Sequence, residues 1–131
     1  PPPGPGASRR VPVGRPRLAV LSATTAAVAL VGGWTWAAAV VPGGFDQVAE
    51  SISALAAEAT PRRWVMTTGL VVTGVAHAVT AWALAPAARA GRVLLALGGL
   101  ATLAVAAFPL PSRTGSSLTH TVAAVASFGL L

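Results

Sequence analysis

Long apolar stretches, separated by short segments with proline, glycine and arginine, dominate the sequence. Three such stretches occupy residues 18–41, 64–84 and 92–108, and a further one starts at Leu118. A helix rises ~1.5 Å per residue, so about 20 residues cross the ~30 Å hydrocarbon core of a bilayer. The pattern therefore predicts an all-α fold, a membrane helix bundle with four spans within residues 18–131.

The fourth apolar stretch, residues 118–131, is shorter than the others. Its 14 residues reach ~21 Å as a helix, which is less than the ~30 Å of a bilayer core. We therefore expect an incomplete fourth span, with further spans of the same protein beyond Leu131.

The first 17 residues have a different composition from the rest of the chain. They are rich in proline and glycine, contain four arginines and offer no apolar face to bury. This composition predicts a disordered basic tail over residues 1–17. An alternative is that the tail and the following apolar stretch form a secretory signal peptide, but residues 18–41 exceed a typical signal core, which favours a retained span.

The segment between the first two spans has a helical periodicity of its own. Its apolar residues recur at steps of three or four: Phe45, Val48, Ile52, Leu55 and Ala59. All three acidic residues of the chain, Asp46, Glu50 and Glu58, also lie here. Asp46 can cap a helix start, because its carboxylate accepts hydrogen bonds from free backbone N–H groups. We predict an amphipathic helix over about 45–59 that lies along the outer membrane interface.

Composition supports lipid as the solvent for most of the chain. Hydrophobic residues make up 54% and charged residues 9%, whereas a soluble domain carries about 25% charged residues. The predicted partner is therefore membrane lipid. The net charge of +6 does not indicate nucleic acid, because the arginines cluster between apolar runs and are not interleaved with aromatic residues on one water-facing surface. The absence of cysteine excludes disulfides and thiolate metal sites.

Arginine placement predicts the orientation of the spans. With the N-terminus inside, six arginines lie on the cytoplasmic side and three on the outer side. The first group is Arg9, Arg10, Arg15, Arg17, Arg89 and Arg92, and the second is Arg62, Arg63 and Arg113. An excess of basic residues on the cytoplasmic side is the usual arrangement. The lack of lysine is typical of a GC-rich bacterial coding sequence, so we expect a bacterial inner membrane with a cytoplasmic N-terminus.

Two histidines are the candidates for chemistry. His77 lies just past the middle of the second predicted span, where an ionisable side chain is costly unless it faces the bundle interior. Gly69 and Thr73 precede it on the same helical face. His120 starts the fourth stretch among hydroxyl residues. For each histidine two interpretations stay open: a side chain that packs and hydrogen-bonds, or a group that handles a ligand, a proton or a metal.

The sequence predicts no metal and no other cofactor. Zinc would need three or four ligands, and His77 and His120 with Asp46 or Glu50 could supply them, but no HExxH-like spacing is present. Ser53 has no assignable base, which argues against a serine hydrolase. These five residues form the candidate polar site.

Three segments resemble one bacterial family: ESISALAAEATPRRWVMTTGLVVTGVAHAVTA, RAGRVLLALGGLATLAVAAFPLP and SSLTHTVAA. The most specific features are residues 52–55, Arg63-Trp64, Phe108-Pro109 and His120. The chain is similar over residues 18–131 to the domain of unknown function 998, a family of multi-pass membrane proteins. The resemblance implies about six spans and no established activity.

Two hypotheses on function follow. The first is a non-enzymatic membrane protein that binds or senses a lipid or a small amphiphile, based on the outer amphipathic segment above a bundle with buried polar residues. The alternative is an intramembrane enzyme or transporter that uses His77 and His120 for proton or metal chemistry. The directions in which the two histidines point decide between them; the oligomeric state is not indicated.

Overall fold

The computed structural model describes residues 13–85 and 87–131. It contains four α-helices and one 3-10 helix: α1 (Pro16–Val40), η1 (Ile52–Ala56), α2 (Trp64–Ala83), α3 (Arg89–Ala107) and α4 (Leu118–Leu130). No strand occurs in the described ranges. The prediction of an all-α helix bundle is therefore confirmed.

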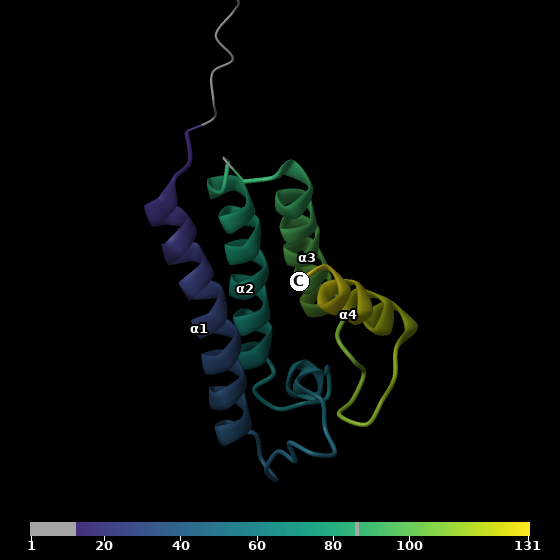
Figure 1. Cartoon of the computed structure of the whole chain (residues 1–131). Helices are drawn as coiled ribbons and strands as arrows, with labels where there is room; N and C mark the ends of the chain where they lie inside the picture. The colour runs from purple at the N-terminus through teal and green to yellow at the C-terminus, as the bar shows by residue number, and fades with distance from the viewer. Residues whose placement is uncertain (1–12, 86) are drawn as a thin grey trace, which may run out of the picture.

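The three long helices lie side by side, with α2 in the centre in contact with both α1 and α3 (Figure 1). The shorter α4 packs against α3 and crosses it at an angle. Two ends can be distinguished. The basic end holds residues 13–17 and the turn between α2 and α3, and the loop end holds residues 41–63 and 108–117.

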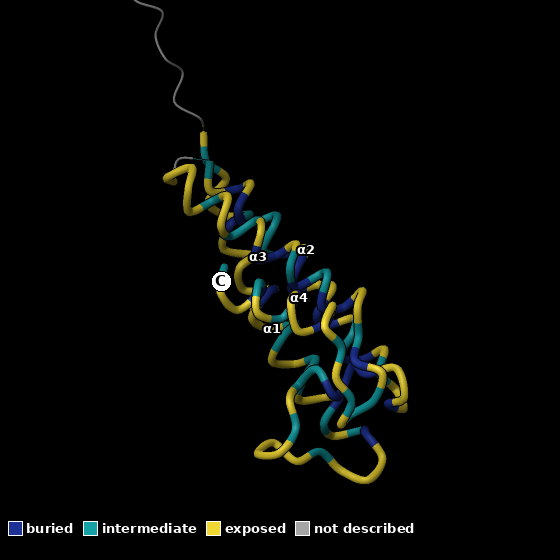
Figure 2. The backbone as a smooth tube through the Cα atoms, turned by 90° about the vertical axis from the view of Figure 1, so that its right-hand side faces the viewer, coloured by how far each residue is buried: buried dark blue, intermediate teal, exposed yellow. Residues whose placement is uncertain are grey.

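Helix length and surface show that α1, α2 and α3 can each cross a bilayer. Their 25, 20 and 19 residues correspond to ~37, ~30 and ~28 Å, close to the ~30 Å core. Exposed residues recur along these helices (Figure 2). Many of them are large and apolar, such as Val28 on α1, which is 65% exposed. Such faces would aggregate in water but suit lipid. The 13 residues of α4 reach only ~20 Å.

The first helix begins two residues before the predicted start. Pro16 occupies its first turn, where a missing N–H costs nothing and the fixed φ suits a helix. The backbone N–H of Arg15 donates to the carbonyl of Ala83 at 3.1 Å, which ties the helix start to α2. Residues 1–12 of the predicted tail lie outside the described residues.

Glycines let the long helices approach to backbone contact. A Cβ added at Gly69 would lie 2.9 Å from the carbonyl oxygen of Ala29 and 3.2 Å from the Cα of Gly33. A Cβ at Gly74 would lie 2.7 Å from the carbonyl oxygen of Gly99. Because lipid is as apolar as a leucine side chain, helices in a membrane associate through close contact of this kind.

Hydroxyl pairs join the helices at buried positions. Ser22 of α1 and Thr80 of α2 lie 2.7 Å apart, and Thr102 of α3 and Ser127 of α4 lie 2.8 Å apart. Thr102 also donates to the carbonyl of Gly98, one turn earlier on its own helix. These hydroxyls are therefore satisfied inside the bundle, as buried polar groups must be in a membrane.

The structure corrects the predicted amphipathic helix over 45–59. This segment contains one short 3-10 helix, Ile52–Ala56, with turns on both sides. The apolar residues assigned to one face do not share an environment: Val48 is 98% exposed, whereas Leu55 is 1% exposed. The segment folds as an ordered loop over the end of the bundle.

Competing hydrogen bonds explain why no long helix forms there. The Asp46 carboxylate accepts from the backbone N–H groups of Val48 and Ala49, at 2.8 and 3.1 Å, and so closes a single turn. Further along, the N–H of Glu58 donates to the carbonyl of Leu110 at 2.8 Å. Backbone groups that bond to a distant loop are not available for a helix.

We expect Gly69→Ala to destabilise the protein. Alanine improves helix propensity by about 1 kcal/mol, but the new Cβ would overlap the Ala29 carbonyl and force α1 and α2 apart, and overpacking costs ~1–3 kcal/mol. Thermal unfolding in detergent measures the change. The control is Gly32→Ala, whose Cβ would meet no atom within 4 Å and should keep or raise Tm. Equal losses in both variants would contradict close packing of α1 on α2.

Candidate functional site

A small cavity of about 90 Å³ lies where the four helices and η1 meet. Most of its lining is apolar, with a few polar side chains among the apolar ones. The residues are Leu30, Ile52, Ser53, Leu70, Thr73, His77, Thr102, Val105, Ala124, Ser127, Phe128 and Leu131. Two of the five predicted site residues, Ser53 and His77, are thus brought together.

His77 lines this cavity and keeps a buried hydrogen-bonding atom without a partner. Its Nδ1 is buried and has no hydrogen-bond partner among the described residues. The Cβ of His77 lies close to α3, because a Cβ added at Gly99 would be only 3.1 Å from it. In the neutral imidazole one nitrogen donates and the other accepts. His77 can therefore offer a ligand one hydrogen bond of either kind.

The hydroxyls of Thr73, Thr102 and Ser127, which line the same cavity, are already engaged. Thr73 donates to the carbonyl of Gly69 at 2.7 Å, and Thr102 bonds both Gly98 and Ser127. A buried polar atom without a partner costs about 1–3 kcal/mol. A ligand that hydrogen-bonds His77 would recover that free energy, whereas the neighbouring hydroxyls have little to gain.

Glu50 lies in the loop end, outside this cavity. The Nε of Arg113 donates to one Glu50 carboxylate oxygen at 2.7 Å, and Nη2 forms an ion pair with the other. The same Nη2 donates to the carbonyl of Gly44 at 2.7 Å. The bond to Arg113, and next the backbone N–H of Asp46, lower the pKa of Glu50 below its ordinary value. This two-point pair joins loop 41–63 to loop 108–117.

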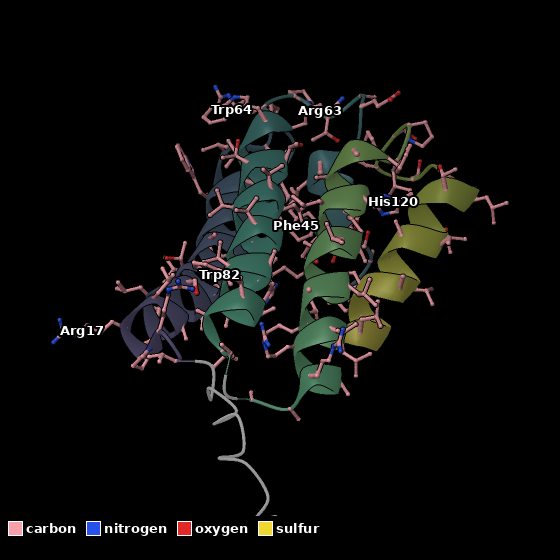
Figure 3. All side chains as sticks on the ribbon, turned by 90° about the horizontal axis from the view of Figure 1, so that it is seen from above. Arg17, Phe45, Arg63, Trp64, Trp82 and His120 are labelled. Atoms are coloured by element: carbon pink, nitrogen blue, oxygen red, sulfur yellow. The ribbon has the colours of Figure 1, made fainter. Side chains whose placement is uncertain are left out.

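Asp46 and His120 also have structural partners of their own. Asp46 closes the turn described above. The His120 side chain is buried, with 5% of its surface exposed. Its Nδ1 lies 2.8 Å from the carbonyl oxygen of Phe108, which ends α3 and is followed by Pro109 (Figure 3). The carbonyls at a helix end need donors from elsewhere, and His120 supplies one.

The candidate polar site is therefore divided between two places. Ser53 and His77 line the central cavity, while Asp46, Glu50 and His120 stabilise the loop end. Within residues 13–85 and 87–131, no three His, Asp or Glu side chains come close enough to hold a metal ion. The arrangement can bind a small group through apolar contacts and one hydrogen bond.

A comparison with protein families supports the resemblance seen in the sequence. The model described as "Protein of unknown function (DUF998)" matches residues 14–131, which include all four helices. The chain belongs to the DUF998 family. No curated protein and no solved structure matches it. Membership in DUF998 assigns no activity, so the function has to be argued from the site itself.

Sequence reasoning missed several residues that shape this DUF998 site. Thr102 has a local signal, because it lies four residues after Gly98, in the spacing of small residues that is typical of packed membrane helices. Ser127 and Ala124 of α4 have no such signal. Arg113, the partner of Glu50, lies 63 residues away from it in the sequence. Only the crossing of α4 over α3 and the contact of two loops bring these residues into place.

The lowered pKa of Glu50 predicts an acid-sensitive loop end. The ion pair contributes stability above the ordinary pKa of 4.5, and this contribution is lost as pH falls through the lowered pKa. From about pH 7 to about pH 3, Tm of the wild-type protein in detergent should therefore drop more than Tm of Glu50→Gln. Glu58→Gln removes a carboxylate outside this pair and should retain the wild-type pH dependence. If Glu50→Gln shows the same drop as wild type, the pair does not stabilise the fold.

Proposed function

We propose that this chain is a non-catalytic membrane protein that binds or senses a lipid or small amphiphile in its central cavity. The observation that carries the proposal is the buried, unpaired Nδ1 of His77, a residue that lines a cavity whose lining is mainly apolar. An amphiphile matches both features, because its apolar part contacts the lining while its polar atom bonds His77. Binding sites for small molecules commonly combine an apolar surface with a few placed polar groups.

The size of the cavity limits what it holds. Its volume of about 90 Å³ is well below the ~300 Å³ of a pocket for a drug-sized ligand. The occupant is therefore a small amphiphile, or the end of a longer one. Phe128, which is 81% exposed, lies at the margin of the cavity, so the rest of a longer molecule would extend along α4 into lipid.

The position of His120 favours binding over the alternative hypothesis. An intramembrane enzyme or transporter of the predicted type would need His77 and His120 at one cavity. His120 is absent from the lining and is bonded to the carbonyl of Phe108. A single histidine, with no second His, Asp or Glu among the described residues of the lining, supports recognition of a ligand more than transfer of a proton.

We further propose a bacterial inner membrane location with the basic end in the cytoplasm. Arg15, Arg17, Arg89 and Arg92 lie at that end, together with Arg9 and Arg10 in the preceding sequence. The loop end carries the other three arginines and all three acidic residues. Six against three is the bias that orients membrane proteins.

A cavity-filling variant tests the binding proposal. The probe is a medium-chain fatty alcohol with a photoreactive diazirine, whose adducts are mapped by mass spectrometry after competition with unlabelled alcohol. Ala124→Phe should lower the saturable labelling of cavity residues, because the added ring occupies the lining at that position. His77→Leu should weaken saturable labelling about fivefold, the effect of one hydrogen bond worth ~1 kcal/mol.

The matched control is Val125→Phe, which adds the same ring one residue later on the exposed face of α4, where Val125 is 67% exposed. It should label as wild type does. Labelling that survives Ala124→Phe unchanged, or that spreads evenly over exposed helix faces, would refute binding in the cavity.

Single introduced cysteines test the orientation. The native chain contains no cysteine, so Ala88→Cys in the turn at the basic end and Val48→Cys in the outer loop are each unique labels. In intact cells, an impermeant thiol reagent should modify position 48, which is 98% exposed, and position 88 only after permeabilisation. Modification of position 88 from outside would reverse the proposed orientation.

A further inference from the structure

Three arginines meet around the last turn of α2 at the basic end. Arg89 and Arg92 of α3 line a surface pocket of about 270 Å³ together with Trp82. On the other side, the guanidinium of Arg15 lies 3.8 Å from the centre of the Trp82 ring. Figure 1 shows the starts of α1 and α3 beside the end of α2, which explains how three separate segments contribute.

No acidic residue of the chain is available to neutralise this cluster. All three acidic residues lie between positions 46 and 58, in the loop end, which is separated from the basic end by the full length of α2 (Figure 1). The first turn of α3 likewise contains no acidic residue, although its N-terminus carries a partial positive charge. The negative charge that balances these arginines must therefore come from another molecule.

The guanidinium of Arg92 is held in place, and both Arg89 and Arg92 retain free donors. Arg92 uses Nε to donate to the carbonyl of Ala81 at 2.8 Å, which fixes its side chain at the end of α2. Within the described ranges neither its Nη groups nor the side chain of Arg89 forms a further hydrogen bond or ion pair. A planar guanidinium binds phosphate with two parallel hydrogen bonds. The pocket thus presents oriented phosphate donors.

Depth in the membrane indicates the source of the phosphate. Trp82 lies at the end of α2 opposite Trp64 (Figure 3), and tryptophans at the two ends of a span sit at the headgroup level of the bilayer. Apolar residues of the same pocket, Val93 and Ala96, continue down α3 toward the core. A phospholipid has the same arrangement, with a charged headgroup at the membrane surface and acyl chains in the hydrocarbon core.

We propose that the pocket formed by Trp82, Arg89 and Arg92, with Arg15 behind the Trp82 ring, binds the headgroup of an anionic phospholipid. The phosphate lies between Arg89 and Arg92, and the first acyl segment runs along Val93 and Ala96. Basic pockets between membrane helices bind anionic headgroups in this way. The site is separate from the central cavity and does not depend on what that cavity binds.

Native mass spectrometry of the full chain in neutral detergent tests the site. Phosphatidylglycerol and phosphatidylcholine are added separately, and lipid retained per protein is measured. Wild type should retain phosphatidylglycerol more strongly. Arg89→Gln should weaken phosphatidylglycerol retention about fivefold, since one arginine near an anionic surface contributes ~1 kcal/mol. Arg89 carries the test because Arg92→Gln would also remove the hydrogen bond to Ala81.

Arg63→Gln removes one positive charge at the loop end and should retain phosphatidylglycerol as wild type does, as should Ala124→Phe in the central cavity. Equal retention of the two lipids, or equal losses in Arg89→Gln and Arg63→Gln, overturns the site. Displacement of the lipid by inorganic phosphate at the same concentration assigns the pocket to free phosphate instead. If Arg89→Gln fails to fold, the wild-type protein is measured at increasing salt concentration instead. Added salt should weaken the retention of phosphatidylglycerol and leave the retention of phosphatidylcholine unchanged. Phosphatidylglycerol retention that does not change with salt refutes the proposal.

Discussion

The close approach of backbones at glycine is the contact on which the rest of this bundle depends. In lipid no hydrophobic force draws apolar helices together, so stability comes from tight packing and from bonds across helices. Gly33 faces Gly69 between α1 and α2, and Gly74 faces Gly99 between α2 and α3. The central helix α2 therefore contacts both α1 and α3 at glycine residues. At these distances the hydroxyls of Ser22 and Thr80 also reach each other.

The same packing creates the central cavity. Gly99 of α3, which contacts Gly74, also lies close to the Cβ of His77, and His77 lines the cavity that α4 helps to enclose. The shorter α4 crosses α3 and is joined to it by Thr102 and Ser127. Two helices that cross at an angle pack closely only near the crossing point. The space left between them away from that point is the cavity beside His77.

The sequence predicted features that depend on local pattern and length. Apolar length alone located α1, α2 and α3 to within a few residues, and the depth of His77 in α2 was readable because a span has a fixed rise per residue. The prediction of a helix over 45–59 was wrong because non-local bonds decide the structure of that segment. Its periodicity was real, but Glu50 is held by Arg113 and Glu58 by the Leu110 carbonyl. Partners more than 50 residues away leave no trace in a local pattern.

The structure separates the candidate site residues for the same reason. Asp46, Glu50 and His120 were grouped with His77 because such residues often act together, yet chemistry of that kind needs them in one place. His120 instead bonds the Phe108 carbonyl at the end of α3, a position that only the turn between α3 and α4 sets. No pattern in the sequence indicates that Ser127 lines the cavity, because its position depends on how α4 crosses α3.

The distribution of charge separates the two ends of the molecule by function. At the loop end three acidic residues match three arginines in number, and the Glu50–Arg113 pair joins the two loops over the bundle. Among the described residues of the basic end, Arg92 donates to a carbonyl and Arg15 lies over an aromatic ring. Gathered like charges without counter-charge destabilise a protein in isolation. We propose that the anionic surface of a membrane provides this counter-charge and so helps to fix the depth and direction of the three spans.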